Sequence, residues 1–88
     1  MPAYMVERYL PGIPYPVFAE AVGRAASAAA EMTIEGVPVR YLGSVYVPDE
    51  ECSFCCFEAR DAVAVSEANR RANAPFWRVV PALVIRRG

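Results

Sequence analysis

The sequence contains no histidine and no lysine, two residue types that commonly reveal a catalytic mechanism. No run approaches the ~20 consecutive apolar residues that a membrane-spanning helix requires. The formal net charge of −1 gives no electrostatic basis for binding nucleic acid or an acidic membrane. The first residues, Met1 to Tyr4, lack the basic stretch and apolar run of a secretory leader. These absences predict a soluble, cytoplasmic protein whose partners are neither nucleic acids nor membranes.

Apolar residues, by contrast, are abundant and make up 56% of the 88 residues. A chain of this length supports one domain, residues 1–88, and hides only about 60–65% of the surface that its unfolded form exposes. It therefore has few interior positions for so many apolar side chains. The excess predicts a second buried surface, either a subunit interface or a ligand cavity.

The spacing of apolar residues predicts the order strand, helix, strand, strand, helix, strand. Strands are expected at residues 3–10, 37–47, 52–59 and 76–85. A first helix is expected at residues 17–32, and a second from its cap at Asp61 to about residue 73. This order predicts an α+β fold, a ferredoxin-like βαββαβ sandwich with both helices on one face of the sheet.

Two prolines give an independent indication of the topology, because a proline cannot donate to a strand ladder and belongs on an edge. Pro38 opens the second expected strand and Pro81 interrupts the fourth, which fits the sheet order 4-1-3-2. Alternation along the fourth strand predicts Trp77, Val79, Leu83 and Ile85 on one face, and Phe76, Val80, Ala82 and Val84 on the other. Since the helices cover one face only, we expect a homodimer that stacks its open faces into an α+β barrel. Arg86 and Arg87 are expected in a solvated tail.

Five segments carry a resemblance to a known family: Met5-Val6-Glu7-Arg8, Ser44-Val45-Tyr46-Val47, Phe54-Cys55-Cys56-Phe57-Glu58-Ala59, Glu67-Ala68-Asn69-Arg70-Arg71-Ala72, and Pro75. They resemble a family of small bacterial ferredoxin-like proteins, long catalogued as a domain of unknown function, that includes a nickel-binding member. The resemblance implies a ferredoxin-like sandwich that pairs into a dimer, with a divalent metal such as nickel as a possible cofactor. Family members commonly carry histidines, which suit nickel best. This chain has none, and the family's glycine-proline step after the second helix reads Ala74-Pro75.

Glu7 and Glu58 are the first candidate site residues. The first and third strands are neighbours in the expected order, so the two carboxylates are expected to face each other across one ladder. Two close carboxylates cannot both ionise easily, and such a pair forms either an acid/base couple or a site for a hard metal ion. Alternatively, each glutamate lies near a strand end and pairs with Arg8, Arg40 or Arg60, or with solvent.

The three cysteines lie together at Cys52, Cys55 and Cys56. On a strand, Cys52 and Cys55 point to opposite faces, so a structural zinc knuckle is not expected. Cys56 shares the face of Glu58 and joins Glu7 and Glu58 as a candidate metal ligand. The alternative is that the cysteines are buried and act as small hydrophobic side chains.

Tyr9, Tyr46 and Phe54, with Cys56, are the candidate ligand-binding residues. Aromatic side chains line small-molecule cavities, and tyrosine hydroxyls can fix polar groups of a ligand. Tyr46 also falls within the Ser-x-Tyr-Val segment of the family resemblance. The alternative is that these side chains belong to the core or to a dimer interface.

Three functional hypotheses follow. The first is a protein that binds a small apolar or aromatic ligand, or a nickel-like divalent metal, without an assigned reaction. The second is a cofactor-independent enzyme of secondary or aromatic metabolism, a cyclase, isomerase or monooxygenase, in which buried Glu7 or Glu58 is the acid/base. The third is an interaction module whose open face only dimerises. The sequence leaves open whether the protein is an enzyme.

Overall fold

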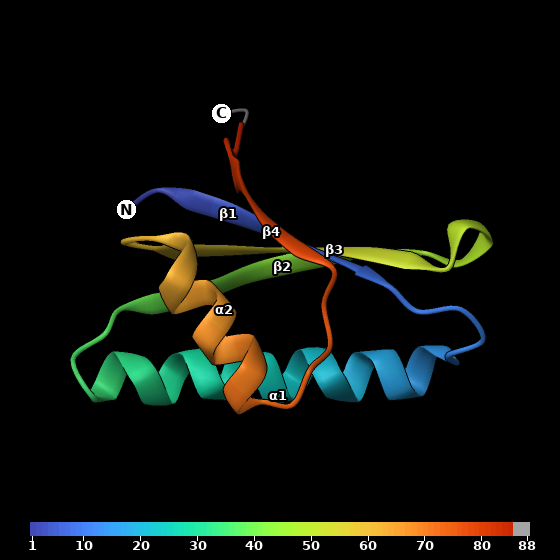
Figure 1. Ribbon diagram of the computed structural model, residues 1–88, viewed down its shortest axis with the longest axis horizontal. Helices are drawn as coiled ribbons and strands as arrows, with labels where there is room; N and C mark the ends of the chain where they lie inside the picture. Colours follow the sequence, from blue (N-terminus) through green and yellow to red (C-terminus); the bar gives the residue numbers. More distant parts are fainter. Residues whose placement is uncertain (86–88) are drawn as a thin grey trace.

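Residues 1–85, the part of the chain that this computed structural model describes, form four strands and two α-helices. The strands are β1 (Ala3–Tyr9), β2 (Val39–Val47), β3 (Cys52–Ala59) and β4 (Arg78–Ala82), and the helices are α1 (Tyr15–Ile34) and α2 (Ala62–Arg71). A 3-10 turn, η1 (Pro48–Glu50), joins β2 to β3. The predicted βαββαβ order is confirmed, and Figure 1 shows both helices on one side of the sheet. The expected tail with Arg86 and Arg87 lies outside the described residues.

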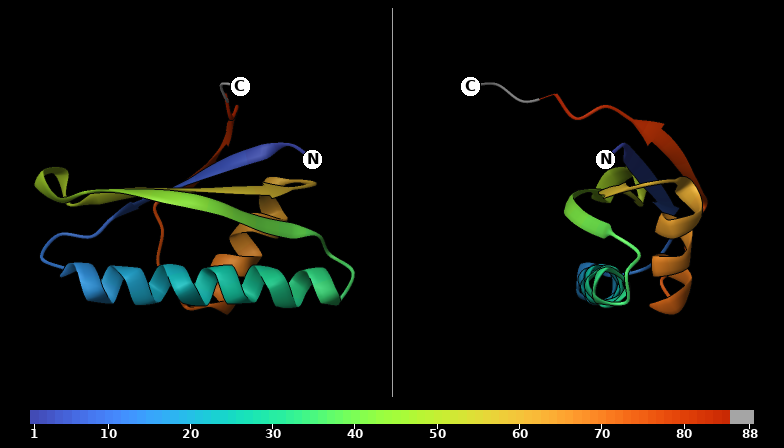
Figure 2. Two further views of the ribbon diagram at one scale, coloured as in Figure 1. Left: turned by 180° about the vertical axis from the view of Figure 1, so that it is seen from behind. Right: turned by 90° about the vertical axis from the view of Figure 1, so that its left-hand side faces the viewer.

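The strands form one sheet in the order β2-β3-β1-β4, and every neighbouring pair is antiparallel. This is the predicted order 4-1-3-2 read from its other edge. Pro81 lies in the edge strand β4, and Pro38 directly precedes the edge strand β2. Both prolines therefore lie where a missing N–H removes no bond from an interior ladder. Seen end on, the right panel of Figure 2 shows a helix layer packed on one face of the sheet.

Helix α1 begins at prolines and is buried along an alanine-rich stripe. Pro14 occupies the N-cap position and Pro16 the first turn, where its missing N–H costs nothing. The buried positions recur at helical spacing: Phe18, Ala21, Ala25, Ala28, Ala29 and Met32. Small alanine side chains allow the helix to approach the sheet closely. Within the described residues, neither helix combines the length and apolar character needed to cross a membrane.

Helix α2 has the cap that the sequence predicts. The Asp61 side chain accepts a hydrogen bond of 2.9 Å from the backbone N–H of Ala64, which satisfies one of the free donors of the first turn. Val65 and Ala68, on the side of the helix that faces the core, are fully buried. The helix ends at Arg71, two residues before the expected end, and Asn73 adopts a left-handed φ of 54°. The chain then turns toward β4.

The hydrophobic core lies between the sheet and the two helices. Its sheet side is formed by alternate residues of the central strands: Val6 of β1, and Cys55, Phe57 and Ala59 of β3, none of which is exposed. We call this side of the sheet the helix face. Because side chains alternate along a strand, the intervening residues point to the opposite side.

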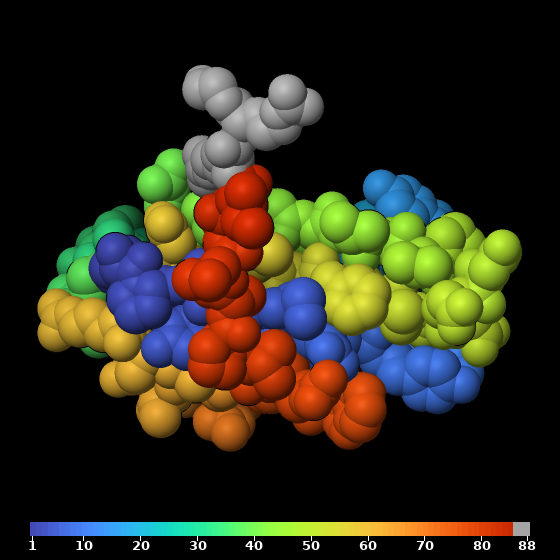
Figure 3. Space-filling view, turned by 90° about the horizontal axis from the view of Figure 1, so that it is seen from above, coloured from blue at the N-terminus to red at the C-terminus, as the bar shows by residue number. Residues whose placement is uncertain are grey.

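That opposite side, which we call the open face, carries no helix. It comprises Ala3, Met5, Glu7, Tyr9, Arg40, Val45, Val47, Cys52, Phe54, Cys56, Glu58, Arg78, Val80 and Ala82. Figure 3 looks onto it from above, with β1 in blue, β3 in yellow and β4 in red lying uncovered by helices. Most of these side chains are only partly buried.

A β-bulge in β2 changes which side chains reach each face. The register shifts between Tyr41 and Gly43, so that Tyr41 lies opposite Phe57 whereas Ser44 lies opposite Cys55. Odd-numbered residues before the bulge and even-numbered residues after it therefore share the helix face. Gly43 has a φ of 153°, a backbone geometry that L side chains rarely adopt.

Strand β4 is shorter than predicted, and its flanks deviate from strict alternation. It spans Arg78–Ala82 instead of residues 76–85. Val79 and Phe76 both pack against the core, although the alternation placed them on opposite faces. The prediction was wrong because the chain enters β4 from the α2 loop, and the segment before Arg78 does not follow the strand.

Candidate functional site

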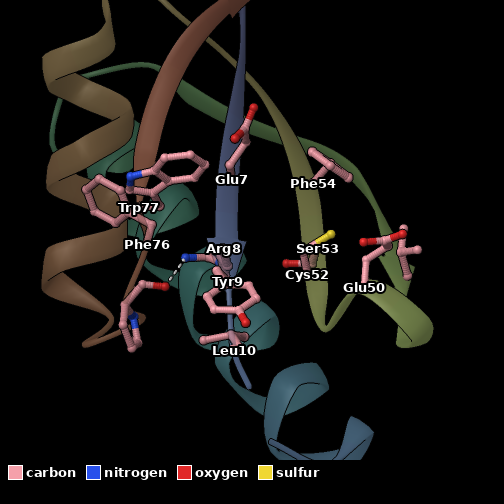
Figure 4. A pocket seen from close by; sticks show the side chains of 12 residues that line it. Glu7, Arg8, Tyr9, Leu10, Glu50, Cys52, Ser53, Phe54, Phe76 and Trp77 are labelled. Carbon is pink, nitrogen blue, oxygen red and sulfur yellow. Dashed lines mark hydrogen bonds between the residues drawn. The ribbon is translucent and has the colours of Figure 1, made fainter. Parts of the chain in front are cut away.

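One end of the open face is hollowed into a cavity of about 830 Å³, within the size range of small-molecule sites. We call it the hollow. It is lined by Glu7, Arg8, Tyr9, Leu10, Val47, Glu50, Cys52, Ser53, Phe54, Pro75, Phe76 and Trp77. Figure 4 shows Phe76 and Trp77 on one side of β1, with Phe54, Cys52 and Glu50 on the other. Aromatic and aliphatic side chains dominate this lining, as in sites that bind small apolar molecules.

The hollow exists because β1 is longer than its neighbour β4. The last ladder pair joins Glu7 to Arg78, and the Trp77 N–H donates to the Glu7 carbonyl at 2.7 Å. Beyond this point β1 continues to Tyr9, while the chain before Arg78 turns away toward α2. The Pro75–Trp77 segment thus forms a wall beside an uncovered stretch of sheet.

Arg8 holds this wall in place from the helix face. The residue is 1% exposed, and its Nη1 donates to the carbonyls of Ala74 at 3.2 Å and Pro75 at 3.0 Å, while Nη2 donates to Asn69 Oδ1. None of the ion pairs among the described residues includes Arg8. Its Nε and the neighbouring Ser53 Oγ are buried without a hydrogen-bond partner among the described residues. A buried guanidinium is costly unless it is bonded, so its three bonds bind the wall tightly to β1.

Glu7 lines the hollow but is fully engaged by Arg78. Its side chain is 13% exposed, and both carboxylate oxygens accept bonds of 3.0 Å from the Arg78 guanidinium. The same guanidinium lies 5.1 Å from the centre of the Trp77 ring, which adds a cation–π contact. The hydrogen bonds that Arg78 donates to Glu7, and then the negative charge of Glu7, raise the pKa of Arg78. The ion pair thus neutralises the carboxylate and supports the aromatic wall.

Glu7 and Glu58 do not face each other, so that prediction was wrong. Both lie on the open face, but Glu7 is opposite Phe54 whereas Glu58 is opposite Ala3. The difference of four residues along the ladder separates them by about 13 Å. Glu58 instead lies 3.5 Å from Arg40, as the alternative interpretation allowed. A neighbouring pair of strands does not by itself set the register, and the register decides which residues meet.

The candidate ligand-binding residues divide between the two faces. Tyr9 and Phe54 line the hollow, whereas Cys56 shares the open face with them but lies outside the lining. Tyr46 packs on the helix face, with ring centroids 4.8 Å from Phe18 and 5.7 Å from Tyr15. The β-bulge moved Tyr46 there, because it inverts the alternation of β2 after Tyr41.

Sequence reasoning missed Arg8 and Arg78 as residues that shape the hollow. Arg8 alternates with Tyr4 and Val6, both of which contribute to the core, so a charge at that position was a readable signal. Arg78 could not be identified in advance, because its pairing with Glu7 depends on the register of β4. Trp77 was expected on one face of the fourth strand, and its position at the wall of the hollow was not anticipated.

The residues of one chain do not fit a nickel site. Within residues 1–85, no three side chains of the histidine, cysteine, aspartate and glutamate types lie close enough to hold a metal ion. Both candidate carboxylates are engaged by arginines, and Cys55 is buried on the helix face with the Ser44 hydroxyl 2.9 Å from its sulfur. Within the described part of the chain, Cys56 therefore has no companion ligands for a metal ion.

Comparison with known proteins identifies relatives of this architecture. Residues 4–81 match the family described as nickel responsive protein SCO4226-like. The crystal structure of SCO4226 from Streptomyces coelicolor A3(2) superposes with a TM-score of 0.77 at 15% identity, covering 96% of this chain and 99% of that chain. No curated protein sequence matches the chain. At this identity the structural likeness establishes the fold alone.

Proposed function

Because this chain belongs to the family of nickel-responsive proteins similar to SCO4226, we propose that it binds a small ligand and acts as a homodimer. The proposed ligand is an apolar or aromatic molecule, and its site is the hollow. The observation that carries the proposal is the 830 Å³ cavity with its aromatic and aliphatic lining. Such a lining favours apolar molecules, because their transfer from water to an apolar wall is favourable.

The charges at the hollow support an uncharged ligand. Glu7 is neutralised by Arg78, and Glu50 lies on the exposed 3-10 turn at the rim. Buried Arg8 points its guanidinium at the carbonyls behind the wall. The polar groups at hand are thus the Tyr9 hydroxyl and the Glu50 carboxylate, which can accept hydrogen bonds from a hydroxyl or an amine on an otherwise apolar ligand.

The apolar side chains of the open face support a homodimer, because no helix of the described chain covers them (Figures 1 and 3). The open face contributes partly exposed apolar side chains such as Met5, Phe54 and Val80, which a second copy stacked on this face would remove from water.

The family name concerns nickel, but the donors of one chain do not support a metal as the ligand. The enzymatic alternative also lacks specific support, because both oxygens of Glu7 accept bonds from Arg78 and Glu58 lies outside the hollow. Calorimetric titration with micromolar Ni²⁺ separates these ideas. We expect no saturable heat, and saturable binding would favour the metal over the apolar ligand.

Two tyrosines of almost equal exposure provide the direct test. Tyr9 is 61% exposed and lines the hollow, whereas Tyr15 is 62% exposed and lies outside it. The probe is the uncharged fluorophore N-phenyl-1-naphthylamine, titrated into the folded protein. Losing about 60 Å² of apolar contact costs about 1.5 kcal/mol, so Tyr9→Ala should weaken binding about tenfold and Tyr15→Ala should leave it unchanged.

Absence of saturable probe binding by the unaltered protein contradicts the proposal. So does an equal effect of Tyr9→Ala and Tyr15→Ala, because the probe would then be bound elsewhere. Circular dichroism of both variants serves as the control for intact folding.

A further inference from the structure

The segment Leu83–Ile85, which we call the arm, is apolar and stands away from the rest of its chain. Leu83 is 91% exposed, Val84 45% and Ile85 89%. Figures 1 and 2 show the chain after β4 rising on the side of the sheet that faces away from the helices. The arm therefore extends into the space above the open face.

The register of the sheet explains why the arm leaves. Ala82, the last residue of β4, lies opposite Ala3, the first residue of β1. Any continuation of β4 passes the beginning of its neighbour and finds no strand to pair with. Among the hydrogen bonds of the described residues, none involves the arm. Three consecutive apolar residues with free backbone groups form a typical segment for docking on another surface.

The same chain offers a matching surface at the other end of its open face. The hollow lies where β4 begins, beside Arg78, and the arm lies where β4 ends, beyond Ala82. Consider two copies stacked on their open faces about a two-fold axis that runs across the strands. The rotation reverses the strand direction, so the arm end of each copy comes over the hollow end of the other.

The area of such a contact agrees with a stable dimer. The fourteen residues of the open face recur at every second position, about 6.6 Å apart along a strand, and neighbouring strands lie about 4.8 Å apart, so these residues cover about 440 Å² of flat sheet. The three arm residues add about 250 Å² of apolar surface. Side chains that project from the sheet add further surface, so the total area approaches the ~800 Å² that each partner of a stable complex buries. Without the arm, the contact falls well short.

We infer that the arm of one copy lies over the hollow of a second copy and closes its mouth. The inference rests on the proposed homodimer and completes the proposed site. Each hollow is then walled by its own Tyr9, Phe54 and Trp77, and covered by the partner's arm. A ligand in the hollow is consequently shielded from water only in the dimer.

Trp77 is the only tryptophan of the sequence, and it stands 70% exposed at the wall of the hollow. Its fluorescence therefore reports the cover directly. The test variant combines Leu83→Asp with Ile85→Asp, and the matched control combines Ile34→Asp with Val63→Asp. Ile34 and Val63 are also apolar and well exposed, at 87% and 72%, but they belong to the helices.

Sedimentation equilibrium and acrylamide quenching of Trp77 are measured on the unaltered protein and both variants, without ligand. The unaltered protein and the control should dimerise equally, with Trp77 several-fold less accessible to acrylamide than in the arm variant. The arm variant should dimerise at least tenfold more weakly, and its Trp77 emission should shift to the red.

Three results would overturn the inference. One is an unaltered protein that is monomeric at high concentration. The second is an arm variant that dimerises like the control, and the third is a weakened dimer with unchanged quenching, because the arm would then contact another surface. Binding of the uncharged fluorophore N-phenyl-1-naphthylamine to the dilute, unassembled protein tests the proposed hollow separately. If the probe does not bind to the unassembled protein, the proposed ligand site is refuted. The acrylamide quenching of Trp77 still tests the position of the arm independently.

Discussion

Replacing Arg8 by methionine is the sharpest test of how the wall of the hollow is held. The substitution keeps most of the volume of this 1% exposed side chain but removes its three hydrogen bonds. Each bond from a charged donor contributes about 1.5–3 kcal/mol. The methionine variant no longer has to bury a charged guanidinium, and this avoided desolvation cost offsets several kcal/mol of the lost hydrogen-bond energy. We therefore expect the free energy of unfolding to fall by about 3 kcal/mol.

That loss is large for a chain of this length, whose total stability is about 4–13 kcal/mol. It corresponds to a decrease in Tm of roughly 12–24 °C. The assay is urea denaturation followed by circular dichroism and by the emission of Trp77, which shares the Pro75–Trp77 wall. Arg8→Lys keeps the charge but not the planar fork, and we expect it to recover less than half of the loss.

Arg40→Met is the matched control, because it makes the same substitution at an exposed arginine. Arg40 lies on the edge strand β2 and contacts Glu58 at 3.5 Å. Its loss should cost less than about 1 kcal/mol. The reasoning is refuted if Arg8→Met is as stable as Arg40→Met, since the bonds of Arg8 would then contribute no net stability. An Arg8→Lys variant equal to the unaltered protein would refute the role of the fork.

Two further predictions follow from the described contacts. In urea denaturation, Asp61→Ala should lower the free energy of unfolding by about 1 kcal/mol, because helix α2 loses its cap. Asp61→Asn can still accept the hydrogen bond from Ala64, so its free energy of unfolding should fall by only a fraction of that amount. Thiol labelling with Ellman's reagent should leave buried Cys55 unreactive until the protein unfolds, whereas Cys52 and Cys56 on the open face should react in the native state and faster on dilution. Equal labelling rates for all three thiols would contradict the assigned faces. Labelling rates of Cys52 and Cys56 that do not change with protein concentration would contradict the stacked dimer.

The order of elements and the sheet topology were predictable because they depend on local patterns. The alanine stripe of α1 has helical spacing, and Asp61 caps the start of α2. Pro81 lies in the edge strand β4, and Pro38 directly precedes the edge strand β2. These signals lie within a few residues of the structure that they specify. The family resemblance agreed with them and is confirmed by the match over residues 4–81.

The candidate site was predictable only in part. Glu7, Tyr9 and Phe54 do line the hollow, because alternation along β1 and β3 is regular. Glu58 and Tyr46 do not, since the first depends on the register between two strands and the second on a bulge within one. Neither property leaves a local signal, and a shift of one residue moves a side chain to the other face.

The sequence by itself determined that two amphipathic helices cover one face of a four-stranded sheet and that an apolar face is left over. Periodicity specifies which side of each element avoids water, and this requires no knowledge of distant residues. Tertiary structure alone decided that β4 ends where β1 begins, that Arg78 meets Glu7, and that Arg8 holds the wall. Those contacts join residues more than sixty positions apart, so they depend on how the completed sheet aligns its strands.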